Sequence, residues 1–153
     1  MVNNHPSNIV DFLNGTCTDS SNRYLQDIWK MDDQEIENTH NFIQWIFPLK
    51  ERSQAVPNSP TLTEDEIIHI KDSNITQNNI KKSSEWFLNF LTRNNYWICY
   101  SDHNHLRITR AIKSLRMIHS NEEAEKFKKH IFDLIEDKEY KISEKALQFW
   151  KCS

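Results

Sequence analysis

The chain has 153 residues and a formal net charge of -3 at pH 7, so its length suits one domain and its charge gives no general attraction to nucleic acid. Aromatic residues make up 11% of the sequence, including five Trp, which excludes a disordered chain because such chains are poor in aromatic residues. Gly15 is the single glycine. Phosphate-binding loops need several glycines, and tight hairpins prefer them, so the composition excludes such loops and favours helices.

The spacing of apolar residues predicts mainly helices along the chain. In chain order, we expect helices at about 9–13, 24–29, 36–47, 63–70, 76–91, 103–118, 120–135 and 143–150. Asn14-Gly15 is typical of a helix end, and Pro48 ends the third helix. A polar loop with two prolines covers 50–62, and the capping box Thr63-Glu64-Asp65-Glu66 follows it.

These elements predict an all-α fold, a single-domain bundle of about seven helices with polar loops over residues 1–153. Residues 96–100 form the only strand-like run, and their pattern fits a short strand, a packed loop or a helix end equally well.

The segment 36–47 has the widest apolar surface of the predicted helices. Asp32 or Asp33 can cap it, and apolar residues cover well over half of its circumference. We therefore expect a central helix, with His40 and Gln44 one turn apart at the edge of the apolar arc.

The segment 103–118 combines an apolar stripe with a polar one. The polar stripe contains His103, Arg107, Arg110 and Ser114. Two guanidinium groups on one helix offer forked donors that suit a carboxylate or a phosphate.

Two longer motifs carry a resemblance to a known family. The first is His-Asn-Phe-Ile-Gln-Trp-Ile-Phe-Pro-Leu at 40–49, and the second is His-Leu-Arg-Ile-Thr-Arg-Ala-Ile-Lys-Ser-Leu at 105–115. Together they resemble the conserved N-terminal region of the opioid growth factor receptor family, whose hallmarks are His-x-x-Ile-Gln-Trp-Leu-Phe-Pro-Leu and Arg-Ile-Thr-Arg. The resemblance spans roughly residues 12–118, followed by C-terminal helices at 120–153. Ile46 replaces the usual leucine, and residues 92–102 lack the family's glycine-containing turn.

The resemblance implies a binding role rather than a reaction. Animal members are described as receptors for an enkephalin-type opioid peptide that act at the nucleus, and no catalytic residues are established for the region. We expect a stand-alone domain without the C-terminal repeats of the animal receptors. Its location is expected to be cytoplasmic.

The candidate site combines the polar edges of the two motif segments. If these segments pack together, their side chains line one groove for a peptide or an anionic ligand, with an aromatic wall. The six candidate residues are His40, Gln44, Trp45, His103, Arg107 and Arg110. The alternative is that the same residues only cap and cross-link the bundle.

The predicted function is a binding or interaction module. Two alternatives stay open, an enzyme of undefined type that uses the same His/Arg cleft and a purely structural or assembly protein. We predict no catalytic residues, cofactor or metal site, because His103 and His105 diverge on a helix and the three cysteines form no Cys-x-x-Cys pair. A protein partner is compatible with this function, whereas nucleic acid and a transmembrane segment are not expected.

Overall fold

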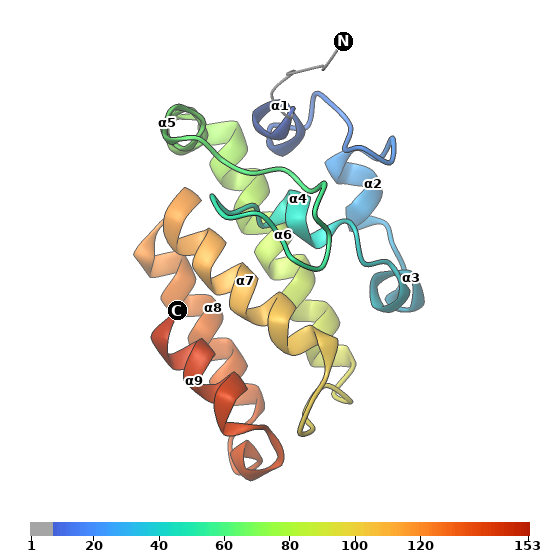
Figure 1. Ribbon diagram of the computed structural model, residues 1–153, viewed down its shortest axis with the longest axis vertical. Coiled ribbons are helices and arrows are strands. Elements are labelled where there is room, and N and C mark those ends of the chain that lie inside the picture. Colours follow the sequence, from blue (N-terminus) through green and yellow to red (C-terminus); the bar gives the residue numbers. More distant parts are fainter. Residues whose placement is uncertain (1–7) are drawn as a thin grey trace. The chain divides into compact units, whose positions relative to one another are not determined.

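The computed structural model describes residues 8–153, which form nine α-helices and one 3-10 turn, with no strand among them (Figure 1). The all-α prediction is therefore confirmed. Within this fold the chain divides into two compact units, Met1–Ile80 and Lys81–Ser153. The predicted domain also included residues 1–7, which lie outside the described part.

The first unit consists of short helices around aromatic and aliphatic side chains. Its elements are α1 (Ile9–Leu13), α2 (Leu25–Trp29), α3 (Asp33–Asn38), α4 (Ile43–Ile46), α5 (Glu64–Asp72) and the start of α6 (Asn74–Arg93). Helix α1 packs against α4 and α5. The contact with α4 includes the rings of Phe12 and Trp45, which meet edge to face with centroids 5.3 Å apart.

Local sequence signals set the helix ends in this unit. The side chain of Asp32 accepts a hydrogen bond from the backbone N–H of Glu35, and Thr63 forms the predicted capping box with Glu66. Gly15 follows α1 with a φ of +90°, a conformation that favours glycine. These three signals depend on a few neighbouring residues, and all three predictions are confirmed.

The prediction of one continuous helix over 36–47 is wrong. The chain forms α3 and α4 instead, and Thr39 between them has an extended backbone. Every residue from Phe42 to Pro48 is buried, and one straight helix cannot turn so wide an apolar surface inward on one face. The β-branched Thr39 and the nearby Asn41 are also weak helix formers, and both lie in the break between α3 and α4.

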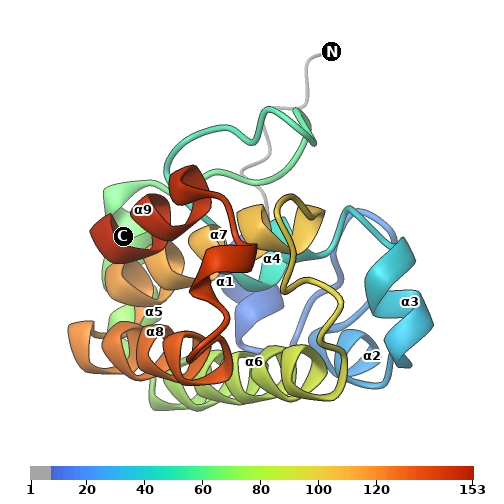
Figure 2. The same ribbon diagram turned by 90° about the horizontal axis from the view of Figure 1, so that it is seen from below.

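The second unit is a group of longer helices. It contains the end of α6, α7 (His103–Ile118), α8 (Asn121–Leu134), the 3-10 turn η1 (Glu139–Lys141) and α9 (Glu144–Cys152). Helix α7 packs against both α8 and α9, and these helices lie side by side in both views (Figure 1, Figure 2). The bounds of α7 match the predicted 103–118.

Two buried tryptophans organise the packing around the start of α7. The rings of Trp97 and Trp150 meet edge to face with centroids 6.3 Å apart. The indole N–H of Trp97 donates to the carbonyl of Leu91, and that of Trp150 donates to the carbonyl of His105. Both polar N–H groups are therefore satisfied although the rings are fully buried.

Residues 96–100 form turns, as the packed-loop alternative predicted, rather than a strand. Backbone hydrogen bonds from Ile98 to Asn95 and from Cys99 to Trp97 close these turns. No helix in the part of the chain that the structure describes is long and apolar enough to cross a membrane.

Candidate functional site

The second unit contains a cleft of about 310 Å³ between the start of α7 and α9. Seven residues between Tyr100 and Thr109 form one side, and four residues between Ser143 and Phe149 form the other. Both sides belong to Lys81–Ser153, so the cleft is built within one compact unit.

Apolar side chains at the cleft are unusually exposed. Tyr100 is 74% exposed, Leu106 68% and Phe149 43%. Single exposed apolar residues are common on proteins, but three around one cleft indicate a surface that a ligand can cover.

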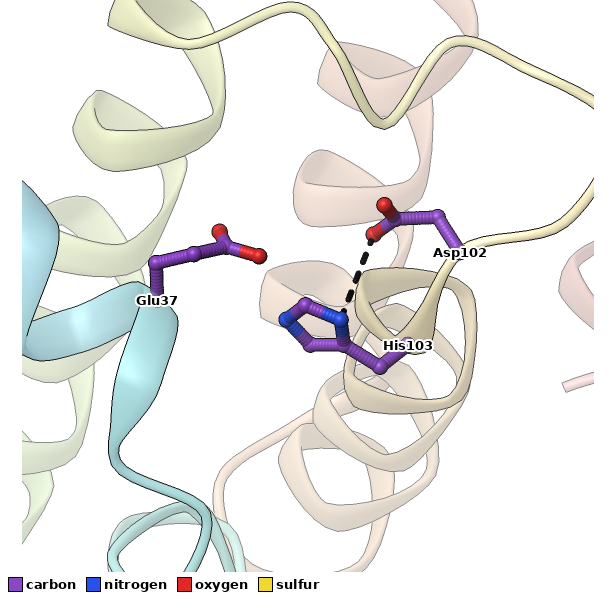
Figure 3. Close-up of side chains that lie close together, drawn as sticks. All are labelled: Glu37, Asp102 and His103. Atoms are coloured by element: carbon purple, nitrogen blue, oxygen red, sulfur yellow. Dashed lines mark ion pairs between the residues drawn. The ribbon is translucent and has the colours of Figure 1, made fainter.

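The start of α7 supplies an acid and a histidine. Asp102 caps the helix, since its Oδ1 accepts from the backbone N–H of Asn104 at 2.8 Å. The same oxygen lies 4.0 Å from Nδ1 of His103 (Figure 3). The Asp102 carboxylate is thus already engaged by the helix end and lies close to the neighbouring imidazole.

His105 forms a rigid part of the cleft wall. Its side chain is buried, and its Nε2 donates to the carbonyl of Trp97 at 2.7 Å. The ring also meets the ring of Trp150 edge to face, with centroids 5.4 Å apart. A donating Nε2 in a neutral imidazole leaves Nδ1 as the acceptor nitrogen.

Helix α9 forms the wall of the cleft opposite α7. Ser143 caps it by accepting from the backbone N–H of Ala146, and its own N–H donates to the carbonyl of Tyr100 at 3.3 Å. This second bond joins the two sides of the cleft. Two residues further on, the ammonium of Lys145 lies 5.9 Å from the centroid of the Phe149 ring. That distance is within reach of a cation–π interaction.

The three predicted site residues of the second unit have different surroundings. His103 lines the cleft, whereas Arg107 and Arg110 do not belong to its lining. Arg107 is only 5% exposed, and its Nη1 donates to Oδ1 of Asn104 at 3.3 Å. Ser114 on the same polar stripe is fully buried, so α7 is enclosed on its polar side as well as its apolar side.

The other three predicted site residues lie in the first unit. His40 is exposed in the segment between α3 and α4, and its carbonyl accepts from Nε2 of Gln44 at 3.2 Å. Gln44 and Trp45 are buried on α4, and Oε1 of Gln44 has no hydrogen-bond partner among the described residues. A groove shared by all six residues stays a prediction.

Sequence reasoning missed most of the cleft. Leu106 offered a signal, because an apolar residue outside the buried stripe of an amphipathic helix is a candidate for contact with a partner. Lys145 and Phe149 are four residues apart on α9, a spacing that brings side chains together but is common on solvated helices.

The comparisons with known proteins agree with the motifs. The family described as the opioid growth factor receptor conserved region matches residues 3–153, which include both walls of the cleft. The chain is similar to the opioid growth factor receptor of Mus musculus, with 30% identity over 129 residues, covering 71% of this chain and 20% of the mouse protein. It is also similar to opioid growth factor receptor-like protein 1 of Mus musculus, with 30% identity over 112 residues, covering 60% of this chain and 24% of that protein.

The chain thus spans about a fifth to a quarter of the length of these relatives. No solved structure matches it.

Proposed function

Because this chain belongs to the opioid growth factor receptor family, we propose that it is a peptide-binding module whose site is the cleft between α7 and α9. One of the mouse relatives is named a receptor, and the family resemblance implies an enkephalin-type peptide as the ligand. The cleft with its three exposed apolar side chains is the observation that carries the proposal.

The size of the cleft limits what it holds. Ligand pockets in proteins have volumes of roughly 300–1,000 Å³, so about 310 Å³ is at the lower end of the range. Such a cleft accommodates one or two residues of a flexible peptide rather than a folded protein surface. The remainder of the peptide extends into solvent.

The wall residues suit a peptide because they combine apolar area with a few polar groups. Tyr100, Leu106 and Phe149 provide the apolar contact, and His103 and Lys145 provide polar atoms that fix its orientation. In this proposal His103 contacts the ligand directly. Arg107 acts through Asn104, which it holds at the first turn of α7.

Removal of an aromatic wall is the first test. We expect Tyr100→Ala to raise the Kd for an enkephalin-type peptide by about tenfold or more, because the few residues that dominate an interface are enriched in tyrosine and their truncation costs about 2 kcal/mol or more. Isothermal titration calorimetry with the purified chain measures this.

Tyr140→Ala is the matched control. Tyr140 is 80% exposed, similar to Tyr100, but it lies in η1 outside the cleft lining. Its removal should leave the Kd unchanged, while circular dichroism shows that both variants are folded. Equal affinity of the two variants, or no heat of binding with the unmodified chain, would refute the proposed function.

A further inference from the structure

We infer that the cleft recognises the free C-terminal carboxylate of its peptide, with Lys145 as the binding cation and the last side chain against Phe149 and Leu106. This inference rests on the proposed function and names the end of the peptide that enters the site. It follows from the charges of the lining and from the position of the lysine beside an aromatic ring.

The lining contains one lysine, Lys145, and one acid, Asp102, and the two side chains differ in their partners. Among the described residues, Lys145 forms no ion pair, so its charge is uncompensated by the protein. The acid in the lining, Asp102, accepts the backbone N–H of Asn104 and lies beside His103. Glu144 precedes Lys145 in sequence, but it is exposed and lies outside the lining.

The ammonium of Lys145 also disfavours the amino end of a peptide. A peptide ammonium in so small a cleft would lie near the ammonium of Lys145, and like charges repel at short range. Asp102 is the competing group for an ammonium, but its Oδ1 already accepts the N–H that caps α7 and lies beside His103.

The place of Lys145 explains why an apolar last residue should accompany the carboxylate. Its ammonium lies 5.9 Å from the centre of the Phe149 ring, so a carboxylate bound to it is held at the apolar wall. The side chain of the terminal residue starts two bonds from the carboxylate carbon, at the Cβ attached to Cα. It therefore lies close enough to contact the Phe149 ring or the exposed Leu106.

The test compares two peptides that differ only at the C-terminus. An enkephalin-type peptide with a free carboxylate should bind at least tenfold more tightly than the same peptide with a C-terminal amide, as measured by titration calorimetry. Lys145→Gln should reduce this ratio to about one, because glutamine keeps a polar end on a slightly shorter side chain but lacks the charge. Acetylation of the amino end should leave the affinity unchanged.

Lys141→Gln is the matched control, since Lys141 is an exposed lysine in η1 outside the lining. It should retain the full ratio. Equal binding of acid and amide peptides would overturn the inference and leave the proposed peptide-binding function intact. If acetylation abolishes binding and amidation does not, the amino end of the peptide occupies the cleft. That result would also overturn the inference. Binding of neither peptide would refute both proposals.

Discussion

Gly15 is the residue with the clearest conformational requirement in the chain. Its φ of +90° lies where side chains of L-residues are strained. A Cβ at this position would also lie 2.8 Å from Nε2 of Gln26, although the end of that flexible side chain can move. The backbone conformation, rather than the contact, therefore dominates the cost of substitution.

We expect Gly15→Ala to lower the free energy of unfolding by about 1–2 kcal/mol, the cost of a positive φ for an ordinary residue. Gly15→Asn should cost less, because asparagine adopts such conformations more readily. Urea denaturation followed by far-ultraviolet circular dichroism gives both values. An alanine variant as stable as the original would contradict the assignment of strain to this turn.

Single residues differ in how far sequence could predict their role. Asp32 and Thr63 were identifiable as caps because a cap depends on the next three residues. Tyr100 and Lys145 were not identifiable as partners in a cleft, because they are 45 positions apart in the sequence and meet only when α9 packs on α7. Local patterns predict local geometry, and the candidate site arises from long-range packing.

Helix α9 shows how one element serves both the core and the cleft. Trp150 is fully buried, touches the rings of Trp97 and His105, and donates to the carbonyl of His105. The adjacent Phe149 is 43% exposed and lines the cleft. The Trp150 side holds α9 against α7 and so positions the Phe149 side for a ligand.

We therefore expect opposite consequences from two adjacent substitutions. Trp150→Ala should destabilise the protein by about 3–5 kcal/mol, as large-to-small changes of buried aromatic residues do. Phe149→Ala should cost less than about 1 kcal/mol in stability yet weaken peptide binding. Chemical denaturation monitored by circular dichroism gives the stabilities. Similar losses for both variants would show that α9 is not divided into a core side and a cleft side.

The bounds of a helix were predictable from the sequence where its apolar residues form a narrow stripe along one face. Helix α7 has the predicted bounds because Asp102 caps it and its apolar stripe repeats over four turns. The prediction of one helix over 36–47 was wrong because the segment has too many apolar residues for one helical face. Thr39 and Asn41 were the residues that signalled the break between α3 and α4, but the apolar pattern around them outweighed that signal.

At the scale of the whole molecule, the family match and the cleft coincide. The match covers residues 3–153, and the C-terminal helix α9 provides one wall of the cleft. The motifs at 40–49 and 105–115 led to the family, but the second overlaps only the α7 side of the cleft. Motif recognition thus identified the relatives, and the packing of α9 was needed to find a binding surface.

The segment 47–63, the longest one without helix among the described residues, separates α4 from α5 in the first unit. Its ends are held together, since Leu49 and Thr61 form an isolated β-bridge and Lys50 pairs with Glu64. Residues between these anchors are mostly exposed, including Arg52. Exposed polar loops of this kind are preferred sites of proteolytic nicking.

We expect trypsin under native conditions to cleave first after Arg52. Cleavage after Lys50 should be slower, because its ammonium is paired with Glu64 and an acidic residue follows it. The two fragments should remain associated, because α1 on one side of the nick packs against α5 on the other. Mass spectrometry of early digests and size-exclusion chromatography measure these outcomes, and Arg52→Gln should delay the first cut. First cleavage after Arg93 would contradict the expectation that the loop at Arg52 is the most accessible site. Separation of the fragments would mean that α1 and α5 do not hold the first unit together.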